Sequence, residues 1–376
     1  MLLSGDMLRY THGSLRQMFT AIRSQQLNAI AVGYSKIGYN YAAFSMSTLS
    51  AWFLNAAKRV AQRSQDPLTQ SVVDLHIGLA YYNLGRLRES KESLEFWLET
   101  MERQGDSWFR MNCHHHLRHL YAVFGHSEQE IAEANIEQQI SETNADPVTN
   151  SWAQYGLANA KARLGLLNDA HDHMARSLGA IESVESDQLT RAILPNHQAF
   201  VLLQSSDYSG AVSVLNESER LIVEKFLYVD YTLRTYPMLI EALVGPNWVN
   251  LSQNDSIRRA KRLSTRTRLF GWRFPNLRPQ VQRVYGRLLC TTGRQRKAIR
   301  YFEKSIMSAR QFGAEYDEAR ALLDLAAVDD ERRDKFRAEA VTILKRLKAV
   351  IPRAEKWQLG EDPDQSCIAP EFEHSS

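Results

Sequence analysis

The sequence repeats one short phrase in three places, as Tyr81-Tyr82-Asn83-Leu84-Gly85-Arg86-Leu87, Tyr121-Ala122-Val123-Phe124-Gly125-His126-Ser127 and Lys161-Ala162-Arg163-Leu164-Gly165-Leu166-Leu167. The glycines of these phrases are 40 residues apart, twice in succession. Ser206 stands 41 residues after the third glycine, and Leu289-Cys290-Thr291-Thr292-Gly293 repeats the phrase nearer the C-terminus. A fixed period of this length is typical of a repeat architecture, in which one structural unit stacks on the next.

Each glycine separates two amphipathic stretches, and the second stretch carries a small residue followed four positions later by a larger one. Small residues let two helices approach closely, and large ones fill the groove of the neighbouring helix. We therefore predict helix–turn–helix units that bury their apolar faces only by stacking. The residue pairs are Ser90/Leu94, Ala170/Met174, Ala211/Leu215, Ala260/Ser264 and Ala298/Phe302.

The predicted fold is an all-α, right-handed α-solenoid of units of about 40 residues, forming one array over residues 1–350. From residue 360 onwards the sequence carries acidic residues and no Lys or Arg, which predicts an acidic, disordered tail over 351–376. The array is expected to contain about eight hairpins, placed at 1–25, 28–64, 68–104, 107–144, 148–184, 188–226, 229–270 and 275–312, followed by a terminal helix pair at 314–350.

Composition is that of a soluble globular protein, with 44% hydrophobic and 24% charged residues in a length of 376. The sequence has no run of about 18 apolar residues, so it predicts no transmembrane helix and no membrane partner. Cys113, Cys290 and Cys367 are widely spaced and odd in number, which argues against a disulfide framework and fits a reducing, cytoplasmic location.

The order Gly78, Tyr81, Gly85, Ser90, Leu94 resembles the tetratricopeptide repeat. The order Gly286, Leu289, Gly293, Ala298, Phe302 repeats it. The period is longer than the standard repeat of about 34 residues, which implies longer helices. One departure stands out, because Arg118 occupies a position where the repeat has a small residue.

Two longer phrases, at 57–67 and 303–314, resemble the C-terminal repeat arrays of large bacterial signalling proteins. Those proteins carry a class III nucleotide cyclase or a Ser/Thr kinase domain, then an AAA/STAND ATPase, then the array. The resemblance implies that this chain is a non-catalytic part, with its effector on another chain or upstream of a truncated start. The chain itself has no phosphate-loop motif, no kinase motif set and no Gly-x-Ser-x-Gly.

Alignment of the repeats predicts a concave, partner-binding groove lined by Asn112, His115, His119, Arg283 and Arg287. His115 and His119 are four residues apart, a spacing that can chelate a metal ion on one helix face. No third ligand accompanies them, so we predict no metal site, and we predict no cofactor and no catalytic residue.

A basic run between 255 and 310 holds 16 Lys or Arg residues against only two acidic ones. Within it, Arg258, Arg259, Arg262 and Arg266 can share one stripe of a second helix. The positive charge concentrated in this run attracts an anionic partner. That partner could be an acidic peptide, an acidic domain or nucleic acid. The aromatic residues of the run cluster at one turn and are not interleaved with the basic ones, which makes nucleic acid the less favoured partner.

These features predict a protein- or peptide-binding scaffold that acts as the sensory or regulatory part of a signalling protein. The partner would be a protein or peptide of acidic character. Two alternatives remain open: a nucleic-acid-binding or transcription-linked regulator that uses the basic 255–310 face, and a stand-alone regulator that senses a peptide or small molecule.

Overall fold

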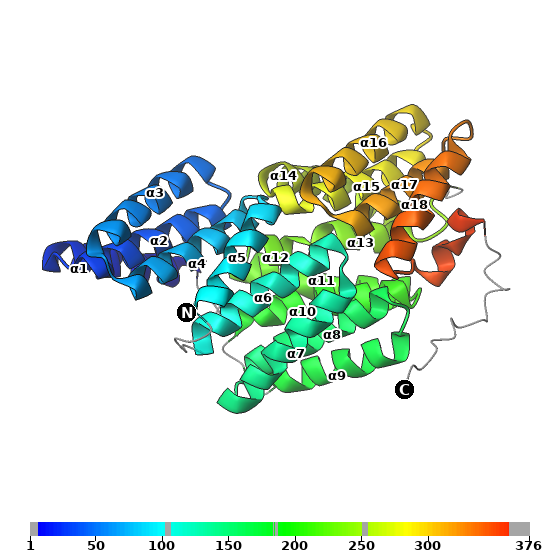
Figure 1. Cartoon of the computed structure of the whole chain (residues 1–376). Helices are drawn as coiled ribbons and strands as arrows, with labels where there is room; N and C mark the ends of the chain where they lie inside the picture. Colours follow the sequence, from blue (N-terminus) through cyan, green and yellow to red (C-terminus); the bar gives the residue numbers. More distant parts are fainter. Residues whose placement is uncertain (1–6, 102–106, 183, 185–186, 250–254, 361–376) are drawn as a thin grey trace.

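The computed structural model describes residues 7–101, 107–182, 184, 187–249 and 255–360. These residues form paired helices and no strand (Figure 1). The predicted all-α solenoid of helix–turn–helix units is therefore confirmed. The helices are α1 (Met7–Ser24), α2 (Leu27–Ala43), α3 (Ser47–Ser64), α4 (Pro67–Asn83), α5 (Leu87–Met101), α6 (Ser107–Phe124), α7 (Ser127–Asn144), α8 (Pro147–Arg163), α9 (Leu167–Glu182), α10 (Gln188–Gln204), α11 (Tyr208–Lys225), α12 (Asp230–Leu233), α13 (Thr235–Val244), α14 (Asp255–Arg273), α15 (Arg278–Cys290), α16 (Gln295–Phe312), α17 (Glu315–Ala326) and α18 (Arg333–Leu347), with short 3₁₀ helices η1 (Pro275–Leu277) and η2 (Arg353–Leu359).

The turns between paired helices have the geometry that the repeated glycines require. Gly85, Gly125 and Gly165 have φ values of +75°, +86° and +82°, a left-handed conformation that a residue without a Cβ adopts at little cost. Two first helices of their pairs, α4 and α8, start where the sequence places an acidic cap. The Asp66 carboxylate accepts a hydrogen bond from the Thr69 N–H at 3.1 Å, and Pro67 occupies the first helical position.

The paired helices pack closely because small residues meet large ones, as the sequence pattern predicts. A Cβ added at Gly78 would lie 3.0 Å from Leu94, and one added at Gly286 would lie 2.5 Å from Phe302. The Ser90 hydroxyl donates a hydrogen bond to the Gly78 carbonyl at 2.7 Å. Small residues at these positions therefore set the separation of the two helices.

The superhelix closes on itself, because its C-terminal third packs against the turns of earlier repeats. The Val350 N–H donates to the Arg163 carbonyl at 2.8 Å, and the Asn276 side chain donates to the Tyr82 carbonyl at 2.9 Å. We call this line of contacts the seam. The seam also includes the close approaches of Gly85 to Pro275, of Gly125 to Tyr316 and of Gly165 to Val350. In a further seam contact, the Ser206 hydroxyl accepts a hydrogen bond from the Ala354 N–H at 2.9 Å.

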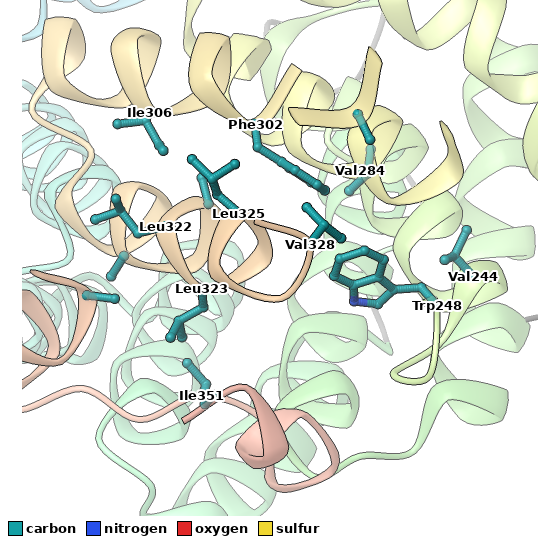
Figure 2. Packing of buried hydrophobic residues seen from close by; sticks show 14 of the residues in the cluster. Val244, Trp248, Val284, Phe302, Ile306, Leu322, Leu323, Leu325, Val328 and Ile351 are labelled. Atoms are coloured by element: carbon teal, nitrogen blue, oxygen red, sulfur yellow. The ribbon is translucent and has the colours of Figure 1, made fainter. Parts of the chain in front are cut away.

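The largest apolar cluster lies in this C-terminal third (Figure 2). Trp248, in the loop that follows α13, is fully buried and packs on Phe302 with ring centroids 5.8 Å apart. Val328 and Leu325 of the α17 region point toward the same cluster (Figure 2). Trp248, from the described part of this loop (245–249), therefore belongs to the core.

Two boundaries differ from the prediction. The first expected hairpin, 1–25, holds the single helix α1 within the residues that the structure describes. The predicted start of the tail, at residue 351, is also too early, because residues 351–360 pack on the array. Ile351 is buried, and so is Glu355, which lies in η2. The rest of the expected tail, 361–376, lies outside the described residues. In the described part of the chain, no helix is both long and apolar enough to cross a membrane.

Candidate functional site inside the superhelix

Two adjoining cavities lie inside the closed superhelix, lined mainly by the first helices of successive repeats. The first, which we call the polar cavity, has a volume of about 100 Å³. The second, the aromatic cavity, has a volume of about 110 Å³. His119 of α6 and Tyr231 of α12 line both cavities, so the two spaces share a wall.

Charged side chains of both signs line the polar cavity. The cations are five arginines and the anions are three carboxylates, which leaves an excess of two positive charges in the lining. They come from α6, α7, α8, α13, α15 and α17 and from the junction of α12 with α13. The residues are Arg118, Arg163, Arg234, Arg283 and Arg320, with Glu130, Glu241 and Asp317.

Two of these arginines are neutralised by carboxylates of α7. Arg118 Nε lies 2.9 Å from Glu137, and Arg163 Nη1 lies 2.7 Å from Glu130. Burial works to raise the pKa of Glu137, but the charges of Arg118 and His115 and the hydrogen bonds from both side chains together hold that pKa below its ordinary value. Burial dominates at Glu130, whose pKa is raised despite Arg163. The pairs fix the arginine side chains against the cavity wall.

A second set of charges, the C-terminal ion network, lies at the other end of the polar cavity. Arg287 contacts Asp324 at 2.7 Å and Glu355 at 2.8 Å. Arg320 contacts Glu355 at 2.9 Å, and Arg283 pairs with Glu241. Burial would raise the pKa of Glu355, but the charges of Arg287 and Arg320 hold that pKa well below its ordinary value. The network therefore binds η2 to α15 and α17.

Arg234 is the lining cation with the weakest ion pair in the described structure. Its nearest carboxylate, that of Asp230, is 3.9 Å away, and its guanidinium donates a hydrogen bond to the Tyr82 hydroxyl at 3.3 Å. Burial raises the pKa of Asp230, which weakens this pair further. Arg234 can therefore accept a second anionic partner.

Several buried polar atoms around the polar cavity have no hydrogen-bond partner among the described residues. The group includes both acceptors and donors, and all belong to lining side chains. The acceptors are Oε1 of Glu130, Oδ1 of Asn159, Oε1 of Gln204 and Oδ1 of Asn276; the donors are Nε of Arg163, Arg283 and Arg320. A buried polar atom that stays unmatched destabilises a protein, so such a cluster is suited to a polar ligand.

The predicted groove residues are divided between the two cavities. Asn112, His115 and His119 line the aromatic cavity, and Arg283 lines the polar one. Arg287 is 0% exposed and lies outside both linings, because its guanidinium is taken up by Asp324 and Glu355. The open, concave groove that the repeat alignment predicts is here an enclosed interior, because the seam closes it.

The predicted basic face lies on α14, a second helix of its pair, and none of its residues lines either cavity. Arg258 pairs with Asp255, and Arg259 pairs with Glu219 of α11 at 3.0 Å. Arg262 and Arg266 are exposed. The basic face is thus partly neutralised and separate from the interior.

Sequence reasoning missed most of the lining residues, among them Asn159, Gln204, Arg234 and Arg320. Another lining residue, Arg118, could be recognised in the sequence, because it departs from the repeat pattern. A Cβ added at Gly156 of α8 would lie 2.6 Å from the Arg118 side chain, so a glycine on the next repeat makes room for the arginine. In the described residues, no group of three or more His, Cys, Asp or Glu side chains could hold a metal ion.

Solved structures with a similar fold include two Rap proteins and a tetratricopeptide repeat protein. A Rap protein complexed with competence and sporulation factor matches over 92% of this chain and 98% of its own length, with a TM-score of 0.70 and 10% identity. The apo form of RapI matches over 90% and 99%, with a TM-score of 0.50 and 10% identity. A tetratricopeptide repeat protein from Parabacteroides merdae matches over 84% and 99%, with a TM-score of 0.40 and 13% identity. No protein-family model and no curated protein matches the sequence. The chain therefore shares its all-α helical-repeat fold with the Rap protein.

Proposed function

We propose that this protein binds a short peptide in the polar cavity and acts as a sensory or regulatory scaffold with no catalysis of its own. The observation that carries the proposal is the group of unmatched donors and acceptors around that cavity. A peptide offers an N–H donor and a C=O acceptor at nearly every residue, so it can satisfy both kinds of atom at once.

The charges of the polar cavity support a peptide that carries a carboxylate, either a side chain or the C-terminus. Four of the five lining arginines are paired closely with a carboxylate, but Arg234 has only the 3.9 Å contact with Asp230. Arginine binds carboxylates through two parallel hydrogen bonds, which fixes orientation as well as supplying affinity. Burial raises the pKa of Asp317, which faces the same cavity, so this side chain repels an incoming anion less than an ordinary carboxylate does.

The similar Rap protein is described in complex with competence and sporulation factor, and this supports a peptide ligand for the shared fold. We extend the proposal to a signalling role in the cytoplasm. The ligand would be read out through a change in the packing of the array, because stacked repeats respond cooperatively to a ligand that favours one arrangement. An effector of the cyclase, kinase or ATPase class, as implied by the phrases at 57–67 and 303–314, is one candidate for the readout.

The test is an affinity selection with the purified full chain and a randomised pool of synthetic hexapeptides, in which retained peptides are identified by mass spectrometry. We expect a set of retained peptides that share an acidic position. Arg234→Gln should weaken their binding about tenfold or more, since a hydrogen bond between charged groups is lost. The matched control is the double variant Arg262→Gln, Arg266→Gln, which removes two arginines from the outer face and should retain the same peptides.

Retention of no peptide by the folded wild-type protein would overturn the proposal. A duplex DNA probe tests the alternative partner on the same samples. Binding of DNA that falls steeply as salt rises, and that is lost in the Arg262→Gln, Arg266→Gln variant, would support a nucleic-acid regulator in place of a peptide sensor.

A further inference from the structure

We infer that the aromatic cavity is a second subsite, which takes an aromatic ligand side chain bearing one hydrogen-bond donor, the indole of tryptophan or the phenol of tyrosine. The inference rests on the proposed function, because it names the side chain that a bound peptide would carry. The polar cavity, with a volume of about 100 Å³, would hold the carboxylate of the same peptide and the backbone unit next to it.

The wall of the aromatic cavity is built mostly of rings and aliphatic side chains, together with Asn112 and Thr190. His115 lies against Trp152 with ring centroids 4.3 Å apart, and against His119 at 4.6 Å. His119 in turn lies 5.0 Å from Tyr231. Leu79 and Ile193 close other parts of the wall. Aromatic walls favour an aromatic guest, because rings interact edge-to-face as well as through buried area.

One wall residue, His116, carries an unmatched buried acceptor. Its Nδ1 lies 2.8 Å from the Asn112 carbonyl oxygen, which can only accept, so Nδ1 carries the proton. Burial lowers the pKa of His116 to about 3, so the ring is neutral near pH 7 and its Nε2 is a bare acceptor. That Nε2 is buried and has no hydrogen-bond partner among the described residues. The buried Tyr231 hydroxyl, on the shared wall, is also unmatched there.

This arrangement discriminates between kinds of guest. A purely aliphatic side chain would fill the space and leave the His116 acceptor unmatched, which costs binding energy. A carboxylate would meet the lone pair of Nε2 with no proton to share. A cation would lie near the Arg118 guanidinium, which donates to His115 at 3.2 Å. An indole or phenol supplies both a ring and a donor.

The two cavities can serve one ligand because His119 and Tyr231 belong to both linings. A peptide whose backbone lies in the polar cavity therefore has a side-chain position next to the aromatic cavity. The inferred ligand class is a short peptide with a carboxylate and a tryptophan or tyrosine.

The direct test uses indole and its hydrocarbon analogue indene as probes of the full-length protein, with binding followed by ligand-observed NMR. The two probes have nearly the same shape, but only indole has an N–H. We expect indole to bind about tenfold more tightly than indene, which corresponds to one satisfied buried hydrogen bond. His116→Phe keeps a ring and removes the acceptor, and should bring the two affinities together. Ile193→Trp should fill the cavity and abolish binding of both probes, and Arg262→Gln is the outer-face control.

Equal binding of indole and indene by the wild-type protein would overturn the inference, as would an unchanged preference in a His116→Phe variant with a normal unfolding transition. The hexapeptide selection separates this outcome from failure of the proposed function. Retained peptides without a shared Trp or Tyr position overturn the inference and leave the proposed function standing. Retention of no peptide overturns both, whatever the small probes do.

Discussion

The Glu355 carboxylate binds the Arg287 guanidinium through two parallel hydrogen bonds, of 2.8 Å and 2.9 Å, although the two residues are 68 positions apart. Both side chains are buried, and Asp324 pairs with the other edge of the same guanidinium. The contact joins η2 to α15, so a segment that follows the last long helix completes the wall of the interior. A buried charge is tolerated only when its partners are all in place, which makes this pair a sensitive point of the fold.

We expect Glu355→Gln to lower the free energy of unfolding by about 3–5 kcal/mol, because Arg287 and Arg320 lose a charged partner inside the protein. Denaturant unfolding followed by circular dichroism measures the change. The control is Glu217→Gln, which removes a carboxylate paired with Arg220 on the surface and should leave the transition nearly unchanged. A Glu355→Gln protein as stable as the control would show that η2 contributes little to the array.

The contribution of Glu355 should vanish in acid. Its folded-state pKa lies below the ordinary glutamate value, so the stabilisation is present above about pH 4.3 and is lost as the pH falls toward the folded-state pKa. The difference in unfolding free energy between wild type and Glu355→Gln should therefore be constant from about pH 7 to pH 5 and shrink below that. A difference that grows on acidification would contradict the assignment.

The buried histidines should make the protein less stable between pH 7 and pH 5. Burial lowers the pKa of His76, His115, His116, His119 and His197, so the unfolded chain takes up protons that the folded chain does not. Stability then falls with pH below about 6.5, by up to about 1.4 kcal/mol per pH unit for each such histidine. Unfolding free energies at several pH values give the slope.

Substitution of one histidine at a time checks this interpretation. His116→Phe should reduce the slope, since one fewer group resists protonation in the folded state. His171, which is exposed, is the matched control, and His171→Asn should leave the slope as it is in wild type. Equal slopes in all three proteins would show that the cluster does not govern the acid response.

Gly85 and Gly293 provide a matched pair for the seam. Both have positive φ, but a Cβ at Gly85 would lie 2.6 Å from Pro275, whereas nothing lies within 4 Å of one at Gly293. Gly293→Ala should cost only the backbone strain, about 1–2 kcal/mol. Gly85→Ala should cost about 1–3 kcal/mol more, because it also forces the seam apart.

Melting temperatures of the two alanine variants, recorded under identical conditions, give this difference. Similar losses in both proteins would mean that the contact with Pro275 carries little energy. Binding of indole offers an independent readout. If the seam also shapes the interior, we expect the affinity for indole to change in the Gly85→Ala variant and to stay the same in the Gly293→Ala variant.

The repeat period predicts the helix pairs well, because each pair is fixed by residues close together in the sequence. Gly125, for example, marks the end of α6 and the start of α7 as expected. Pro195 shows the limit of local rules: proline favours the first turn of a helix, but this one lies inside α10, which starts after the Asp187 cap. The cap fixes the start, and the helix continues through the proline because its other residues pack in the core.

The candidate site was less predictable, because it depends on how far the superhelix turns. Arg283 and Arg287 were assigned to an accessible groove from their register, and they are buried by Glu241, Asp324 and Glu355. These partners are between 37 and 68 positions away. No local sequence pattern predicts that the C-terminal third packs against earlier repeats. The closure of the superhelix is therefore evident only in the three-dimensional structure.

The closure also bears on the order in which the molecule becomes functional. A chain is synthesised from its N-terminus, and its early repeats can stack as soon as they emerge. The walls supplied by Arg283 and Arg320, and the Glu355 that pairs with Arg320, emerge afterwards. A nascent array therefore remains an open trough until about residue 355 has left the ribosome. Under the proposed function, peptide binding would require the complete array, and an early-truncated product would keep its helices but lack the closed interior.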